Sequence, residues 1–128
     1  MRFGFRPKFK PGKGRTTKRV PGTMNKTEER YEREVLAPMK ERGEIIGYGF
    51  EDHTFRLGPD LRYTPDFSVQ LANGDMEFHE IKAGLKTGKP LIEDDSRVKI
   101  IVAAEQMPYT FKMRWFDKTA GQWAERVF

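Results

Sequence analysis

Alternating apolar and polar positions near the middle of the chain predict two β-strands joined by a tight turn. The segments 64–69 and 76–81 are rich in β-branched and aromatic side chains, which favour strands. Between them, segment 72–75 contains the pair Asn73-Gly74, which is typical of a tight hairpin turn. We therefore expect an antiparallel hairpin in this part of the chain.

This hairpin would bring three charged side chains to one of its ends. Asp66 stands near the start of the first strand, whereas Glu80 and Lys82 stand near the end of the second. Because successive side chains alternate between faces, Glu80 and Lys82 should share one face while Ile81 points to the other. Two carboxylates and an ammonium group that converge on a strand pair are typical of a site for a divalent cation.

A helix is predicted before the hairpin, beginning near Asn25. Asn25 can cap the helix, and Glu28 follows at the capping-box spacing. We expect Pro38 to kink or end this helix, and Gly43 is a candidate stop.

Acidic residues interrupt the apolar stripe of this helix. Burying an unpaired carboxylate is costly, so Glu28 and Glu32 each need a partner, such as a metal ion or a Lys. For Glu28 the capping role alone would also explain the position. The sequence does not decide whether Glu28 or Glu32 is the helix acid of the candidate site. At 100° per residue, the residues on the apolar side are Met24, Glu28, Tyr31, Glu32, Val35, Leu36 and Met39.

The remaining segments complete a mixed α/β pattern. Segments 45–50 and 53–57 are expected to form a hairpin or one bent strand that joins the central sheet, and residues 58–60 form a turn. Strands are expected at 109–116 and 123–128. The order of helix, two or three antiparallel strands, helix, strand and strand predicts an α/β sandwich with a mixed sheet.

The second helix is expected to begin at Asp94, Asp95 or Ser96, any of which can cap it. It should run to about Gln106 and stop at Pro108. Its apolar residues fall on two faces, which predicts burial on two sides. Alternatively, the β-branched run at residues 98–102 would form a strand.

Composition adds a charge asymmetry. The 128 residues carry a net charge of +5, yet residues 1–22 hold eight Lys or Arg and no acidic residue, which leaves 16 basic against 19 acidic residues beyond them. We interpret residues 1–22 as a flexible basic arm that binds nucleic-acid phosphate, ahead of a single domain at 23–128. Alternatively, the segment is a solubilising extension or packs its Phe residues on the domain. The arm's cations are Arg2, Arg6, Lys8, Lys10, Lys13, Arg15, Lys18 and Arg19.

Scarce residue types disfavour several kinds of site. The chain has no Cys, its histidines are His53 and His79, and its serines are Ser68 and Ser96, so zinc, thiol and serine-nucleophile chemistry are poorly supported. His79 alternates with Glu80 and should face away from the carboxylates in a structural role. No apolar run approaches the length of a membrane span, so a soluble, cytoplasmic protein is expected.

Residues 83–95 are predicted to form a loop over the site. The run from Gly84 to Pro90 is superficially similar to a phosphate-binding loop, but Pro90 stands where that motif needs Ser or Thr for magnesium. We interpret the loop as a mobile flap in which Lys86 and Lys89 touch backbone phosphate.

These residues suit phosphodiester hydrolysis. The reaction needs a positioned water and positive charge against the developing phosphorane, both of which Mg²⁺ supplies when carboxylates hold it and leave water sites open. Asp66 and Glu80 would be the bridging ligands, with the Ile81 carbonyl as a third. Lys82 would orient the water or stabilise the leaving charge, and Glu28 or Glu32 would complete the site or bind a second ion.

The pattern of a helix Glu, Pro65-Asp66 and Glu80-Ile81-Lys82 resembles the PD-(D/E)XK nuclease superfamily. The stretches 25–28, 63–66 and 78–82 are similar to a group of small phage and prophage nucleases within it, a superfamily that also includes restriction enzymes, exonucleases and Holliday-junction resolvases. The resemblance implies a restriction-endonuclease-like α-β-β-β-α-β core with a mixed sheet flanked by helices. It implies catalysis by Asp66, Glu80 and Lys82, with Glu28 as the helix acid and metal ligand.

One exonuclease signature of the superfamily does not fit. Some exonuclease-type relatives carry Gln-x-x-x-Tyr on the second helix, whereas Gln106 and Tyr109 here are one residue too close.

The resulting hypothesis is a Mg²⁺-dependent DNA endonuclease, with Mn²⁺ as a substitute, that acts on branched, flapped or junction DNA. Cutting two strands would favour a homodimer, and a phage-encoded enzyme would work in the cytoplasm of its bacterial host. The alternative is a non-catalytic basic nucleic-acid-binding module, which would need no metal.

Overall fold

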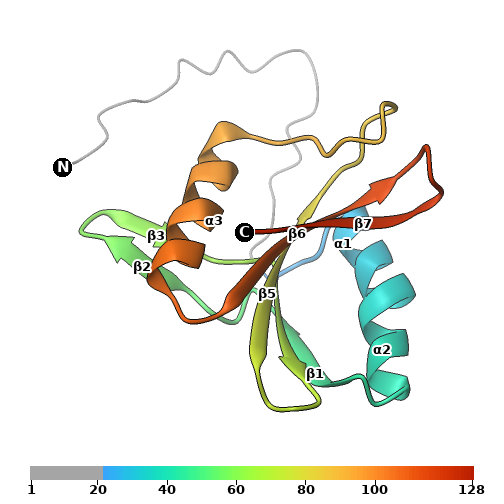
Figure 1. Cartoon of the computed structure of the whole chain (residues 1–128), viewed down its shortest axis with the longest axis horizontal. Helices are drawn as coiled ribbons and strands as arrows, with labels where there is room; N and C mark the ends of the chain where they lie inside the picture. The colour runs from blue at the N-terminus through green and yellow to red at the C-terminus, as the bar shows by residue number, and fades with distance from the viewer. Residues whose placement is uncertain (1–21) are drawn as a thin grey trace.

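A computed structural model of the protein describes residues 22–128, and these residues form an α/β fold around a five-stranded mixed sheet. The strand order is β1-β4-β5-β6-β7, in which β5 and β6 are parallel and the other neighbours are antiparallel. Helices cover both faces of this sheet (Figure 1). The strands are β1 (Ile45–Phe50), β4 (Phe67–Leu71), β5 (Met76–Lys82), β6 (Thr110–Asp117) and β7 (Gln122–Val127).

The N-terminal helix begins at the predicted place. Asn25 caps it, and the predicted capping box with Glu28 is present. The helix does not end at Pro38, contrary to one form of the prediction: it passes through a π-helical turn and continues to Glu41, with Gly43 beyond it at a φ of 75°. A π turn places Pro38 at the start of the next helical turn, where its missing N–H costs little. The three segments are α1 (Lys26–Tyr31), η1 (Glu32–Leu36) and α2 (Ala37–Glu41).

The predicted central hairpin is formed by β4 and β5. Gly74 takes a φ of 93° in the turn, and the register pairs Phe67 with His79. The first strand begins later than predicted, at Phe67, because Thr64 and Pro65 connect it to the preceding ribbon. Asp66 therefore stands directly before β4.

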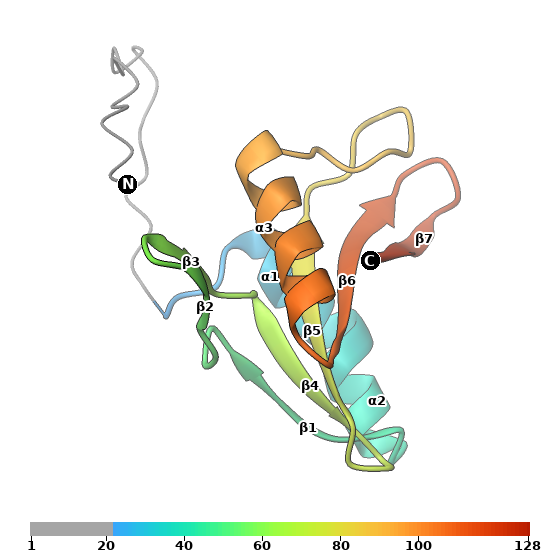
Figure 2. The same cartoon turned by 60° about the vertical axis from the view of Figure 1, so that its left-hand side comes forward.

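The segment before this hairpin differs from the prediction. Residues 45–50 form β1, but β2 (Phe55–Gly58) pairs with β3 (Leu61–Tyr63) in a separate two-stranded sheet. Figure 2 shows this ribbon beside the start of β4. The predicted turn at 58–60 gives β2 a closer partner than β1, and Glu51 turns the chain away with a φ of 48°. The expected hairpin or bent strand over 45–57 is therefore wrong.

The second helix, α3 (Asp94–Gln106), has the predicted extent but a different start and burial. Its N-cap is Glu93, so the predicted caps at 94–96 lie inside the first turn. Ile100 and Ala103 are buried, whereas Val98 is 54% exposed. The predicted burial on two sides is wrong because the sheet and the β2–β3 ribbon contact a single face of the helix.

Two hydrophobic clusters lie on opposite faces of the sheet. One includes Tyr31, Leu36 and Phe67 beneath α1 and α2, and the other includes Phe78 and Phe111 beneath α3. Within residues 22–128, no helix is long and apolar enough to cross a membrane. The basic arm proposed for residues 1–22 lies outside the described residues, apart from Gly22.

Candidate functional site

Three buried carboxyl groups meet at one end of the β4–β5 hairpin. Asp66, Glu80 and Glu28 are 6%, 8% and 2% exposed. The structure thus brings Asp66 and Glu80 together as the hairpin predicts, and adds Glu28 from α1. We call these three residues, with the neighbouring Lys82, the carboxylate cluster.

The Asp66 carboxyl group has a strongly raised pKa. Its Oδ2 accepts a hydrogen bond of 2.7 Å from the backbone N–H of Ile81. Burial, followed by the negative charges of Glu80 and Glu28, raises the pKa of Asp66 to about 9, against the opposing effect of the Ile81 N–H. The fold therefore holds this carboxyl where ionisation is costly unless further positive charge is present.

Glu80 is held by two neighbours. The Tyr63 hydroxyl donates a hydrogen bond of 2.9 Å to Oε1, and the Lys82 ammonium lies 3.5 Å from Oε2. Burial raises the pKa of Glu80, and the positive charge of Lys82 opposes that rise. Burial and the adjacent Glu80 charge also raise the pKa of the Tyr63 phenol, which keeps it a hydrogen-bond donor.

Glu28 belongs to the cluster while it also caps α1. Its Oε1 accepts from the Asn25 N–H at 2.9 Å, and a hydrogen bond to Asp66 contributes to the raised pKa of that residue. Glu32 instead interacts with Tyr48, where it adds to the effect of burial in raising the phenol pKa. Of the two helix acids considered from the sequence, Glu28 is thus the one beside Asp66.

Lys82 shares a face of β5 with Glu80, as predicted. Its ammonium donates a hydrogen bond of 2.8 Å to the Ser96 hydroxyl on α3, and its side chain is 12% exposed. The amine is therefore held between Glu80 and the first turn of α3.

His79 lies on the opposite face of β5, as its alternation with Glu80 predicts. One ring nitrogen is 2.8 Å from the Tyr31 hydroxyl and the other is 3.0 Å from Glu77. Burial lowers the pKa of His79, which favours the neutral ring. The surrounding contacts extend to β6 and β7 through ion pairs of Lys112 with Glu77 and of Arg114 with Glu125. We call these six residues the His79 network: Tyr31, Glu77, His79, Lys112, Arg114 and Glu125.

The carboxylate cluster offers oxygen donors, which are the ligand type that hard divalent cations prefer. Within residues 22–128, no group of three or more His, Cys, Asp or Glu side chains is arranged to hold a metal ion. Mg²⁺ does not need such a group, because proteins usually bind it through one or two carboxylates, with water and ligand phosphate completing the octahedron. Asp66 and Glu80 would supply those carboxylates, with the Ile81 carbonyl as the predicted additional ligand.

The predicted flap is a folded loop that contacts β6. An isolated bridge joins Gly84 to Pro90, and the Trp115 indole N–H donates to the Gly88 carbonyl at 2.9 Å. Lys86 and Lys89 are exposed on this loop, so their predicted contact with phosphate is sterically open.

Sequence reasoning missed Tyr63 and Ser96, which position Glu80 and Lys82. Their roles depend on how β3 and α3 meet β5, and no local pattern marks them. Sequence and structure comparisons add no assignment: no protein-family model, curated protein or solved structure matches the chain.

Proposed function

We propose that this protein is a metal-dependent deoxyribonuclease that hydrolyses DNA phosphodiester bonds with Mg²⁺ or Mn²⁺. The observation that carries the proposal is the carboxylate cluster, in which three buried acids meet at the end of the β4–β5 hairpin and Lys82 lies 3.5 Å from Glu80. Buried ionisable groups with strongly shifted pKa values are typical of functional sites, and a cation bound at this cluster would favour the ionised form of Asp66, whose pKa is raised.

The chain path supports the same proposal. The elements α1, β1, β4, β5, α3 and β6 follow one another as α-β-β-β-α-β, and their strands lie in the order β1-β4-β5-β6. This agrees with the core expected of the PD-(D/E)XK superfamily. The β2–β3 ribbon would then be an insertion, and β7 an added edge strand.

Three members of the cluster, and Tyr63 beside it, have roles in the proposed mechanism. Asp66 and Glu80 would hold the cation, which when bound would supply Lewis acidity and a water of lowered pKa. Lys82, fixed by Ser96, donates hydrogen bonds to the attacking water or to the charge that develops on phosphate. Tyr63 keeps one oxygen of Glu80 in place.

The domain is small, so we propose that the enzyme selects DNA by shape, such as a branch, flap or junction, rather than by base sequence. A second copy of the chain would provide the second cut on a two-stranded substrate. The basic arm would add affinity for phosphate that does not depend on sequence.

The test is cleavage by the full chain of labelled linear, flapped and four-way DNA in Mg²⁺, Mn²⁺ or EDTA. Asp66→Asn, Glu80→Gln and Lys82→Met should abolish cleavage, whereas Glu105→Gln, an exposed change on α3, should retain it. Equal cleavage by the wild type and Asp66→Asn would refute the nuclease assignment. Metal-independent DNA binding without cleavage would instead support a non-catalytic module.

A further inference from the structure

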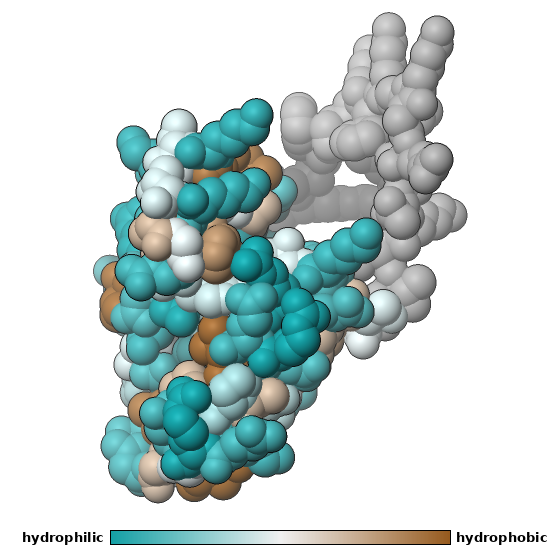
Figure 3. Space-filling model, turned by 90° about the vertical axis from the view of Figure 1, so that its right-hand side faces the viewer, coloured by the Kyte–Doolittle hydropathy of each residue, from teal (hydrophilic) through white to brown (hydrophobic). Residues whose placement is uncertain are grey.

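A second charged feature is lined by the residues next in the chain to Glu28 and Lys82. A surface pocket of about 220 Å³ lies between α1 and the β6–β7 hairpin, and α1 contributes Lys26, Thr27 and Arg30 to it. Lys118 enters from the β6–β7 turn. The surrounding face is largely hydrophilic (Figure 3). The pocket therefore gathers three cations from two separate parts of the chain.

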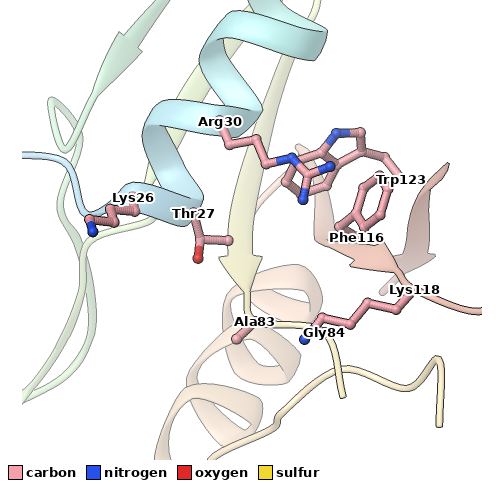
Figure 4. Close-up of a pocket in the computed structure, with 8 residues that line it drawn as sticks. All are labelled: Lys26, Thr27, Arg30, Ala83, Gly84, Phe116, Lys118 and Trp123. Atoms are coloured by element: carbon pink, nitrogen blue, oxygen red, sulfur yellow. The ribbon is translucent and has the colours of Figure 1, made fainter. Parts of the chain in front are cut away.

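Arg30 is held in place before any ligand binds. Its Nε donates a hydrogen bond of 2.7 Å to Glu34, and its guanidinium carbon lies 3.8 Å from the centre of the Phe116 ring. Figure 4 shows Arg30 reaching from α1 toward the rings of Phe116 and Trp123, and Lys118 extending toward Gly84. Thr27 lies on α1, below Arg30 in this view. A stacked and hydrogen-bonded guanidinium loses little freedom on binding an anion.

The aromatic residues of the pocket support Arg30 and do not offer a face to a base. Trp123 donates its indole N–H to Glu34 at 3.1 Å and packs edge-on against Phe116 and Tyr31. The face of Phe116 is covered by Arg30. Glu34 offsets one positive charge, so the pocket retains a net positive charge. Its chemistry suits a phosphate group rather than a nucleobase.

The floor of the pocket is the backbone directly after Lys82. A Cβ on Gly84 would collide with the Phe116 carbonyl oxygen, so glycine lets this backbone lie against β6. Thr27 directly precedes Glu28 in the chain, as Lys82 directly precedes Ala83. A phosphate in the pocket would therefore contact backbone that leads directly into Glu28 and Lys82 of the carboxylate cluster.

We propose that this pocket binds a backbone phosphate of the DNA strand that enters the carboxylate cluster, through Arg30, Lys118 and the Thr27 hydroxyl, with Lys26 at the rim. This inference rests on the proposed function, because it places the strand relative to Asp66 and Glu80. It makes the pocket a sequence-independent contact that fixes which phosphodiester reaches the metal site.

The experiment measures DNA binding by the full chain in EDTA, using the fluorescence anisotropy of a labelled oligonucleotide over a range of salt. The variant Arg30→Gln/Lys118→Gln should weaken binding about tenfold and reduce the salt slope by about two, one unit for each lost phosphate contact. The control Arg33→Gln/Lys40→Gln removes the same charge from exposed positions of the same helical segment outside the pocket, and should keep the wild-type slope.

Lys118→Gln alone, in the exposed turn, should give about half of the slope change if the double variant does not fold. In cleavage assays with metal, the pocket variants should raise KM more than they lower kcat. Equal affinity and slope for pocket and control variants would overturn the inference.

Inorganic phosphate at matched ionic strength should leave DNA affinity within about twofold, because a single phosphate lacks the neighbouring contacts of a strand. Displacement of DNA by phosphate at low concentration would reassign the pocket to a free anion. Since binding in EDTA does not require catalysis, these outcomes are separate from a failure of the nuclease assignment, which cleavage by Asp66→Asn would reveal.

Discussion

The two faces of β5 carry polar groups whose carboxyl side chains have different surroundings. In the His79 network, the acids Glu77 and Glu125 face the cations Lys112 and Arg114. In the carboxylate cluster, the side chains of Asp66, Glu80 and Glu28 are buried, and the Lys82 ammonium lies 3.5 Å from Glu80. Both groups are built on the same strand, so the difference reflects the residues chosen at alternate positions and not a difference in fold.

The pKa values of the acids on the two faces are shifted in opposite directions. A hydrogen bond from His79, followed by the charge of Lys112, lowers the pKa of Glu77 against the effect of burial. Burial and like charges raise the pKa of Asp66. A buried carboxyl group with a raised pKa lowers the stability of the fold at neutral pH, and a bound cation would offset that cost. This contrast distinguishes the candidate site from a structural network.

The largest expected effect is on activity. Asp66→Asn or Lys82→Met should lower kcat/KM for DNA by at least about 10²-fold, since each removes charge or a metal ligand at the reacting phosphate. Glu125→Gln, on the opposite face, should change kcat/KM by less than about threefold, because it does not contact the site. Single-turnover cleavage assays on matched protein concentrations measure both, and a comparable loss in Glu125→Gln would remove the distinction between the faces.

Tyr31→Phe should have the next largest effect, on stability. The hydroxyl is 2.8 Å from a His79 ring nitrogen and accepts a hydrogen bond from Arg114 at 3.1 Å, so its removal leaves buried polar groups unpaired. The free energy of unfolding should fall by about 1–3 kcal/mol in urea titrations. An unchanged stability would mean that the His79 network contributes little to the fold.

Asp66→Asn should change the free energy of unfolding in the opposite direction to Tyr31→Phe. In the metal-free protein at pH 8, it should raise the free energy of unfolding by at least about 1.4 kcal/mol, the value of one pKa unit. Asp66 keeps its proton in the folded protein up to a pH of about 9, while the unfolded chain releases it near the ordinary value of 3.8. Wild-type stability should therefore fall as pH rises through this window, and the fall should be weaker in Asp66→Asn. A pH-independent difference between the two proteins would contradict this account.

The smallest effect separates the two helix acids. Glu28→Gln retains a side-chain oxygen that can accept the hydrogen bond from the Asn25 N–H but removes a carboxylate from the cluster, so it should lower cleavage about tenfold. Glu32→Gln is one turn further along the helix, beside Tyr48, and should leave cleavage unchanged. Equal effects of the two changes would show that proximity to Asp66 is irrelevant.

Local signals predicted the parts of the site that depend on neighbouring residues in the chain. Asn73-Gly74 sets the hairpin, which aligns Asp66 with Glu80, and the capping-box spacing with helical periodicity turns Glu28 inward. Alternation along β5 separates His79 from Glu80 and Lys82.

The predictions that were wrong or missing depend on contacts between segments that are distant in the chain. The pairing of β2 with β3 results from competition between possible partners, which periodicity does not rank. The exposed face of α3 has apolar residues but no element to cover it within residues 22–128, so Val98 remains accessible. Tyr63 and Ser96 contact the site only because of how β3 and α3 pack on the sheet.

The most direct test of the central claim is a crystal of the protein soaked in Mn²⁺ and examined for anomalous scattering. The account predicts a peak between the carboxylates of Asp66 and Glu80, and no such peak in crystals of Asp66→Asn. A peak elsewhere, or none in a well-ordered wild-type crystal at saturating Mn²⁺, would contradict the assignment of the carboxylate cluster as a metal site.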